Sequence, residues 1–188
     1  KSIIYSQIIS PYFYKEEFIM KNLSKVMAVV LAFLMTISSV SFAAFTDVAE
    51  NASYGEAVSV LNALGILKGD TDGAFRPDDT IKRSEEAKMA VLAMGLGDAA
   101  EAAKGESRFP DVSVDHWANG YINVATAQKL VVGYDTGYFL PDKEITYAEA
   151  MTIFVRAMGY EVYAQSKGGF PQGYIVAGSN NGLTKNVQ

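Results

Sequence analysis

Two glycine-rich stretches decide the fold of this chain: residues 69–78 read GDTDGAFRPD and residues 133–142 read GYDTGYFLPD. They lie 64 positions apart, and the same shift places residues 45–95 on residues 109–159 without a gap. Outside the loops, the first copy shares with the second Phe45, Asp47, Val48, Ile81, Glu85, Met94 and Gly95. A fixed internal period of this kind indicates that the chain repeats one supersecondary unit.

The first half of each copy predicts a helix. Asn51 and Asp115, which are equivalent under the shift, are residue types that cap helix N-termini. The apolar residues that follow in the first copy keep helical spacing, namely Tyr54, Val58, Leu61 and Leu64. We expect this helix to end at Gly65 or Gly69.

The second half of each copy predicts a second amphipathic helix. Its apolar positions follow i, i+3, i+4 and i+7, and they are Ala87, Ala90, Val91 and Met94, then Met151, Phe154, Val155 and Met158. Gly95 and Gly159 are expected to end these helices. In the loops between helices, Gly73 and Gly137 suit a turn with positive φ, and Phe75 and Phe139 are expected to pin the loop to the core.

Shorter segments connect and extend the copies. Residues 96–108 form an alanine-rich connector for which we expect a short helix over 99–103, and residues 160–169 form the second connector. A third unit begins near Phe170, because a shift of 53 places Tyr121 on Tyr174. Since one unit of this size buries too little apolar surface to be stable alone, neighbouring units must share an all-α core.

The composition excludes several classes of function. Of 188 residues 49% are hydrophobic and none is cysteine, which excludes disulfide scaffolds and thiol chemistry. Residues 1–43 carry four lysines and two glutamates, so the net charge of −5 leaves −5 − (+2) = −7 for the rest. Nucleic acid is therefore a disfavoured partner, and an acidic ligand needs local cations. His116 is the only histidine, no catalytic relay or metal site is indicated, and we expect a protein that is not an enzyme and has no cofactor.

The N-terminal region has the pattern that is typical of an export signal. A basic segment from Met20 to Lys25 precedes an apolar run over 26–40, and Ser41 and Ala43 are the small residues of a cleavage site after Ala43. The run is shorter than the roughly twenty residues of a membrane span, so no stable span is expected after cleavage. We interpret residues 1–19 as a mistranslated upstream segment, because the lysine and glutamate codons of residues 15–17 are purine-rich, as a ribosome-binding site is.

These motifs together resemble the S-layer homology family. The residues that carry the resemblance are the openings at 45–48 and 109–112, the loops at 69–77 and 137–141, residues 115–118, and the segments 81–85 and 145–149. The organisation is then an upstream segment 1–19, a signal peptide 20–43, repeat 1 over 44–104, repeat 2 over 105–168 and a partial repeat 3 over 169–188. The resemblance implies tandem repeats in a pseudo-threefold bundle whose grooves bind a secondary cell-wall polysaccharide, often pyruvylated.

The resemblance also implies that an arginine before the second helix holds the anionic sugar. Arg83 stands there in the first copy, with Lys82 beside it, and Tyr147 replaces it in the second. A guanidinium grips a carboxylate with two parallel hydrogen bonds, and the helix N-terminus adds partial positive charge.

Other candidate ligand-binding residues have structural alternatives. Glu149 forms a capping box with Thr146, whereas Glu85 lacks the threonine and is freer to pair with a cation or a sugar hydroxyl. Asp47 and Asp111 either orient a sugar hydroxyl or bind local backbone amides. Trp117 and Tyr147 are candidate sugar platforms, although helical spacing favours core packing for Trp117.

The sequence thus predicts a secreted protein of the cell wall or S-layer surface, anchored without covalent bonds to secondary cell-wall polysaccharide or another peptidoglycan-linked glycan. Two alternatives stay open. The repeats are the tether of a larger polysaccharide-degrading enzyme, or they associate with one another in an S-layer lattice.

Overall fold

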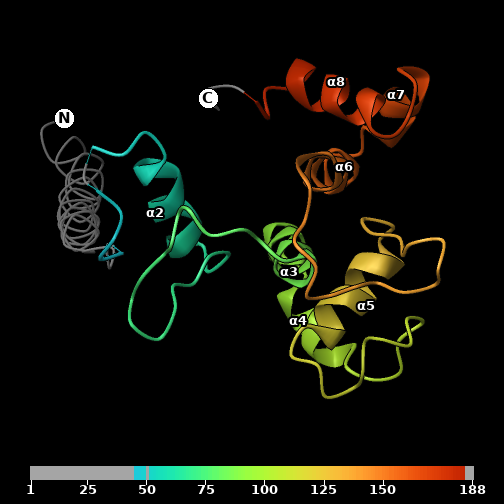
Figure 1. The fold of residues 1–188 in the computed structure, drawn as a ribbon, viewed down its shortest axis with the longest axis horizontal. Coiled ribbons are helices and arrows are strands. Elements are labelled where there is room, and N and C mark those ends of the chain that lie inside the picture. Colours follow the sequence, from blue (N-terminus) through green and yellow to red (C-terminus); the bar gives the residue numbers. More distant parts are fainter. Residues whose placement is uncertain (1–44, 50, 185–188) are drawn as a thin grey trace, which may run out of the picture. The chain divides into compact units, whose positions relative to one another are not determined.

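The computed structural model describes residues 45–49 and 51–184 (Figure 1). The predicted upstream segment and signal peptide lie outside these residues. Over the described part the chain is all-α, as predicted, and its one β-type pairing is an isolated bridge between Lys82 and Glu144. None of the described helices is long and apolar enough to cross a membrane.

The helices follow the sequence repeat. They are α2 (Gly55–Ala63), α3 (Arg83–Ala93), α4 (Gly97–Ala102), α5 (Asn119–Ala127), α6 (Tyr147–Ala157), α7 (Glu161–Ser166) and α8 (Gln172–Asn180). The 64-residue shift places α2, α3 and α4 on α5, α6 and α7, and the 53-residue shift places α5 on α8. The helix–loop–helix unit is therefore confirmed in both copies. The short helix expected over 99–103 is present as α4, slightly earlier in the chain, and α7 is a helix in a connector for which the sequence predicts none. Helix α8 lies where a third unit is expected to begin.

The first helices begin later than predicted. The N-cap residues of α2 and α5 are Tyr54 and Ala118, not Asn51 and Asp115. The reason is a tight turn before each helix, in which backbone N–H groups bond three residues back, as Asn119 does to His116. His116 also accepts a hydrogen bond from the Ala118 N–H through Nδ1, at 3.1 Å.

Glycines end the second helices and shape the loops as predicted. Gly95 and Gly159, which follow the C-caps of α3 and α6, have φ of 71° and 78°. Gly137 has φ of 83° in the second loop. Phe139 in that loop is fully buried, and its ring centroid lies 5.4 Å from that of Phe109.

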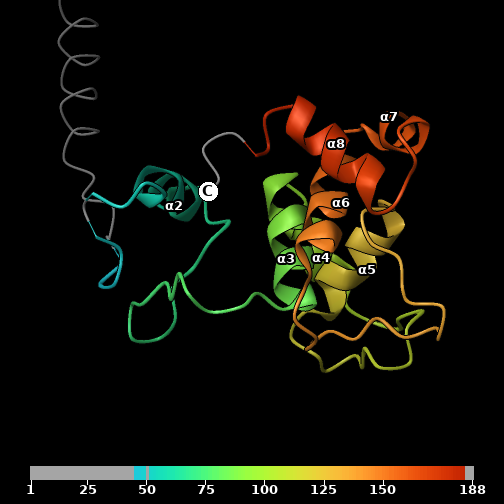
Figure 2. The ribbon, with the colours of Figure 1, turned by 45° about the horizontal axis from the view of Figure 1, so that its top comes forward.

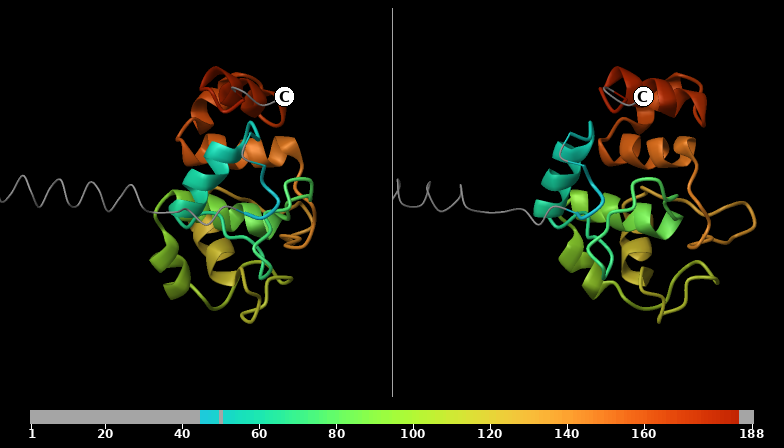
Figure 3. Two further views of the ribbon diagram at one scale, coloured as in Figure 1. Left: turned by 90° about the vertical axis from the view of Figure 1, so that its left-hand side faces the viewer. Right: turned by 60° about the vertical axis from the view of Figure 1, so that its left-hand side comes forward.

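Helix packing is offset from the sequence repeat. The second helix of one repeat packs against the first helix of the next, so α3 contacts α5 and α6 contacts α8, while α4 and α7 cover α5 and α8 (Figure 2). Helix α6 lies between α3 and α8 and contacts both (Figure 3). One buried cluster is centred on Val91 and Ile122, and another on Val155 and Tyr174. The core is shared between repeats, as expected.

Glycines permit the close approach of the connector helices. A Cβ on Gly120, in α5, would meet the carbonyl oxygen of Ala100, and a Cβ on Gly173, in α8, would meet that of Ala164. The two glycines are equivalent under the 53-residue shift. At the same position in α2 the chain has Glu56.

Candidate functional site

Arg83, the first residue of α3, reaches from repeat 1 into repeat 2. Its side chain is only 6% exposed. Nε donates to the Phe139 carbonyl at 2.9 Å and Nη2 to the Val132 carbonyl at 3.4 Å. Nη1 lies 3.2 Å from the Glu149 carboxylate and forms an ion pair with it. Arg83 is therefore a buried cation whose side chain is fixed by three hydrogen bonds. Its other two N–H groups have no hydrogen-bond partner among the described residues.

An aromatic ring and a second cation complete this cluster. The guanidinium of Arg83 lies 4.6 Å from the ring centroid of Tyr134, and the Lys143 amine lies 4.5 Å from it. The Tyr134 hydroxyl donates to Glu149 and accepts from the Lys143 amine at 2.9 Å. Burial opposes ionisation of Glu149, but the hydrogen bonds from Tyr134 and Thr146 and the charge of Arg83 lower the pKa of its carboxyl. The carboxylate is thus held in its charged form.

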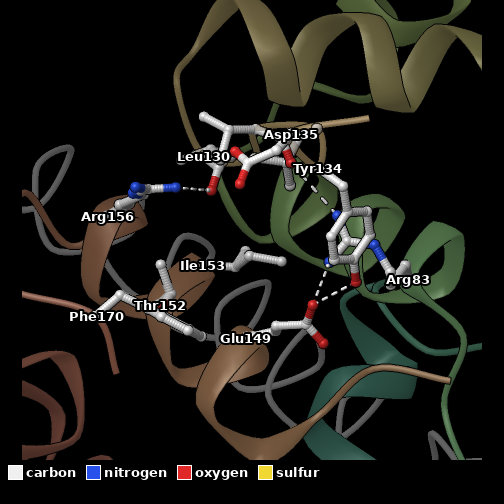
Figure 4. Close-up of a pocket in the computed structure, with 12 residues that line it drawn as sticks. Arg83, Leu130, Tyr134, Asp135, Glu149, Thr152, Ile153, Arg156 and Phe170 are labelled. Carbon is white, nitrogen blue, oxygen red and sulfur yellow. Dashed lines mark hydrogen bonds and ion pairs between the residues drawn. The ribbon is translucent and has the colours of Figure 1, made fainter. Parts of the chain in front are cut away.

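The cluster forms one wall of a pocket of about 350 Å³, a volume that suits a small ligand. The pocket lies between the start of α3, the 130–135 segment and α6 (Figure 4). Its polar and aromatic lining comprises Arg83, Tyr134, Asp135, Glu149, Thr152, Arg156 and Phe170. Residues of repeats 1, 2 and 3 therefore meet at one site.

Arg156 lies on the opposite side of the pocket from Arg83 (Figure 4). Nε donates to Glu161 at 2.8 Å, Nη2 to the Tyr174 hydroxyl at 3.2 Å and Nη1 to the Leu130 carbonyl at 3.4 Å. Arg156 is a pocket residue that the sequence motifs do not indicate. The one difference that the sequence shows is that the equivalent position of α3 holds the apolar Leu92.

The two glutamates both cap their helices. Glu149 completes the predicted capping box: its N–H donates to Thr146 Oγ1 at 3.3 Å, and it accepts the Thr146 N–H at 2.9 Å. Glu85 is less free than expected, since it accepts the Lys82 N–H at 2.8 Å. The Lys82 amine points elsewhere, 3.5 Å from Asp142, and neither Glu85 nor Lys82 lines the pocket.

Asp47 holds the first glycine-rich loop. Its carboxylate accepts the N–H groups of Phe75 at 2.7 Å and Arg76 at 2.6 Å. These backbone amides lie in the loop and not in the turn that carries the aspartate. The hydrogen bond from Phe75 is the main cause that lowers the pKa of Asp47. Of the two expected roles, the structure shows backbone binding.

Asp111 repeats this arrangement in the second loop. It accepts the Phe139 N–H at 3.0 Å and the Leu140 N–H at 2.7 Å. Because the Phe139 carbonyl accepts from Arg83, Asp111 fixes the peptide that holds the pocket arginine. Asp111 does not line the pocket itself.

The two candidate platforms are both on the surface. Trp117 is 49% exposed, so the expectation of core packing was wrong. It lies in the turn before α5, where helical spacing does not apply. Tyr147 is 54% exposed and lines a smaller hollow of about 220 Å³ with Phe154 and Leu183. It therefore does not replace the buried contacts of Arg83.

The fold and the site define a class: an all-α repeat protein whose neighbouring units share a core and form between them a pocket in which charged side chains meet apolar ones. The sequence model of the S-layer homology domain matches residues 44–85 and 108–151. The chain belongs to the S-layer homology family.

Similar proteins are named for the bacterial surface. The chain is 39% identical to the "Cell surface protein" of Thermoanaerobacter kivui over 87% of its length, and 35% identical to the "Surface layer protein" of Brevibacillus choshinensis over 89%. It is 37% identical to the "Cellulosome-anchoring protein" of Acetivibrio thermocellus over 46%. It spans 22%, 15% and 20% of these three proteins, respectively, so about a fifth or less of each.

Proposed function

We propose that this chain anchors a bacterial surface protein to the cell wall without covalent bonds, by binding a secondary cell-wall polysaccharide. The observation that carries the proposal is the pocket at which Arg83 meets repeat 2. Membership of the S-layer homology family and the names of the relatives support a location at the cell wall. Anchoring of this kind requires no catalytic step.

The pocket has the chemistry that a charged saccharide needs. The free N–H groups of Arg83 and Arg156 suit the acid group of a pyruvate ketal, because charge-assisted hydrogen bonds are stronger than neutral ones. The exposed carboxylate of Asp135 can accept hydrogen bonds from sugar hydroxyls. The negative charges of Asp135 and Glu149 balance the positive charges of the two arginines in the pocket. Recognition of an acid group therefore depends on hydrogen bonds from the free N–H groups of the arginines and not on a net positive charge of the pocket.

Several contacts are needed for useful affinity. One charge-assisted hydrogen bond contributes about 1.5–3 kcal/mol, whereas even millimolar binding requires about 4 kcal/mol. Arg83 alone is therefore insufficient. Repetition of the ligand along a polymer, and of the protein across a surface, would raise the effective affinity.

Co-sedimentation with wall sacculi tests the proposal. The chain should sediment with native sacculi and remain in solution once mild acid has removed the polysaccharide. Asp135→Ala should weaken binding with the fold intact, and Asp142→Ala, another exposed carboxylate outside the pocket, is the matched control. Equal binding to stripped sacculi would redirect the proposal to peptidoglycan or a protein partner.

The anchored protein is a separate question, on which the names of relatives differ. "Surface layer protein" favours a lattice component that self-associates, and "Cellulosome-anchoring protein" favours a tether for other activities, which include polysaccharide degradation. Sedimentation velocity over a concentration series separates them in part. Growth of assemblies from this chain alone would favour the lattice.

A further inference from the structure

A polar network joins Arg156, on α6, to the two helices that follow it. Tyr174, on α8, is only 1% exposed. Its hydroxyl donates to Glu161 of α7 at 2.6 Å and accepts from Arg156 Nη2 at 3.2 Å. It also accepts from the side-chain amide of Gln165 at 3.0 Å, so the donor and both acceptor positions of the hydroxyl are used. Side chains of α6, α7 and α8, which pack together in Figure 2, therefore meet at one hydroxyl group.

The same network fixes the guanidinium of Arg156. Nε donates to one carboxylate oxygen of Glu161 at 2.8 Å, while the Tyr174 hydroxyl binds the other oxygen. The guanidinium carbon lies 5.4 Å from the Tyr174 ring centroid, so the ring packs against the charged group. Burial opposes ionisation of Glu161, but the hydrogen bonds that it accepts, that from Arg156 first, lower the pKa of its carboxyl. Two of the five N–H groups of Arg156 have no partner among the described residues, and Arg156 lines the pocket (Figure 4).

The packing of the helices does not require this network. In the equivalent group of α3, α4 and α5, Leu92 stands in the place of Arg156 and Gly97 in the place of Glu161, so the ion pair cannot form there. Only the tyrosine is shared, as Tyr121. Helix α4 nevertheless covers α5 as α7 covers α8. Because a buried ion pair adds little stability compared with apolar packing, the contribution of the network lies in the geometry that it imposes on Arg156.

We propose that Tyr174 and Glu161 are positioning residues, which hold Arg156 in the orientation that presents its two free N–H groups to the ligand. This inference rests on the proposed function, because the orientation of Arg156 affects binding only if the pocket takes an acidic saccharide. Neither Tyr174 nor Glu161 lines the pocket, so their effect on binding passes through Arg156. A side chain that is already held loses less conformational entropy when the ligand binds. Since Tyr174 belongs to the third unit, the affinity of the pocket depends on the packing of α8 against α6.

Tyr174→Phe tests the proposal, because it removes one hydroxyl and keeps the ring. The probe is wall polysaccharide released from sacculi and cut to short oligosaccharides, and the readout is the dissociation constant from titration calorimetry. Tyr174→Phe and Glu161→Gln should each weaken binding about three- to tenfold, as the loss of one hydrogen bond does. Tyr121→Phe removes the equivalent hydroxyl of α5, outside the pocket, and is the matched control, with a change of less than about twofold expected.

A double-mutant cycle separates positioning from a general effect on the fold. Arg156→Leu gives α6 the residue that α3 has at the equivalent position, Leu92, and should itself weaken binding. In this background Tyr174→Phe should change the affinity less than about twofold, because no guanidinium is left to position. An equal loss in both backgrounds would show that Tyr174 acts through the fold and would overturn the proposal. If Tyr174→Phe does not fold, Glu161→Gln, at a side chain that is 40% exposed, takes its place in the cycle.

Nuclear magnetic resonance measures the positioning without a ligand. The chain has four arginines, so their Nε–H signals can be resolved. The Arg156 Nε–H should exchange slowly with solvent, and Tyr174→Phe or Glu161→Gln should accelerate this exchange about fivefold or more. The Arg83 Nε–H, which donates to the Phe139 carbonyl, is the internal control and should exchange at an unchanged rate. Fast exchange of the Arg156 Nε–H in the wild-type chain would refute the positioning role.

The outcomes separate this inference from the anchoring function. If the wild-type chain binds the oligosaccharides and Tyr174→Phe binds them equally well, the positioning role is refuted and anchoring stands. If both variants bind more weakly than wild type and the loss disappears in the Arg156→Leu background, the proposal is supported. If the wild-type chain binds neither oligosaccharides nor native sacculis' polymer, the anchoring function is wrong and the positioning role is wrong with it.

Discussion

Glu86 should make the stability of the fold depend on pH. This residue lies in the first turns of α3, is 2% exposed, and its Oε1 has no hydrogen-bond partner among the described residues. Burial raises the pKa of its carboxyl from 4.5 to about 7. The second copy has Ala150 at the equivalent position, so the repeat itself does not require an acid there.

The sign and size follow from linkage between protonation and folding. Below pH 4.5 the carboxyl is protonated in both states and costs nothing. Between pH 4.5 and 7 the unfolded chain releases this proton while the folded chain keeps it, so stability falls as pH rises. Above pH 7 the full cost applies. The rise in the pKa of Glu86 from 4.5 to about 7 corresponds to a loss of about 3 kcal/mol in the free energy of unfolding, at 1.36 kcal/mol per pKa unit. This is a large share of the 5–15 kcal/mol that is typical for the unfolding of a domain.

Glu86→Gln removes the charge at nearly constant volume. Urea unfolding of wild type and variant, followed by circular dichroism at pH 4.5, 6 and 8, measures the difference in unfolding free energy. The variant should match wild type at the lowest pH and exceed it by up to about 3 kcal/mol at pH 8. Glu56→Gln, an exposed acid of α2, is the control and should change stability by less than about 0.5 kcal/mol. A Glu86→Gln difference that stays constant with pH would refute the reasoning.

Three further predictions concern the contacts between repeats. Arg83→Ala breaks a buried ion pair and should cost about 3–5 kcal/mol in thermal or urea unfolding, whereas Lys82→Ala, exposed and adjacent, should cost under about 0.5 kcal/mol; equal costs would contradict the buried geometry. Asp111→Ala removes the acceptor of two loop N–H groups, so hydrogen exchange in the second loop should accelerate and the free energy of unfolding should fall by about 2 kcal/mol. Unchanged exchange would show that the loop keeps its conformation without Asp111. Gly120→Ala forces a Cβ into a facing carbonyl and should cost about 1–3 kcal/mol or more. Gly105→Ala, where nothing lies within 4 Å, is its control, and similar melting temperatures for the two would disprove the close approach.

Local patterns predicted the helices and their ends well. The apolar spacing and the glycines at 95 and 159 describe interactions within a few residues of chain, which the sequence expresses directly, and the 64-residue period shows that the same local pattern occurs twice. The predicted N-caps were wrong because a cap residue such as Asp115 can begin either a helix or a tight turn. Asp115 suits a cap, but a tight turn continues to Ala118 before the helix begins.

The candidate site was predicted only in part, since its contacts join distant segments. The motif led to Arg83 and Glu149, but not to the ion pair between them, which spans 66 residues. For Asp111 the sequence left open a sugar contact or nearby backbone amides, and the amides that it binds lie 28 and 29 residues away in the chain. Arg156 was overlooked because a single charge on an amphipathic helix does not reveal which neighbour it faces.

The sequence by itself therefore determined the repeat, the all-α class and the family, because these depend on periodicity and on short motifs. Only the tertiary structure decided that α3 pairs with α5 and α6 with α8, so that Arg83 of repeat 1 and Phe170 of repeat 3 join the pocket residues of repeat 2. The same packing buried Arg83 and left its counterpart Tyr147 exposed. Equivalent positions in a repeat share a local structure, but their burial depends on which neighbour packs against them, and that is a property of the assembled fold.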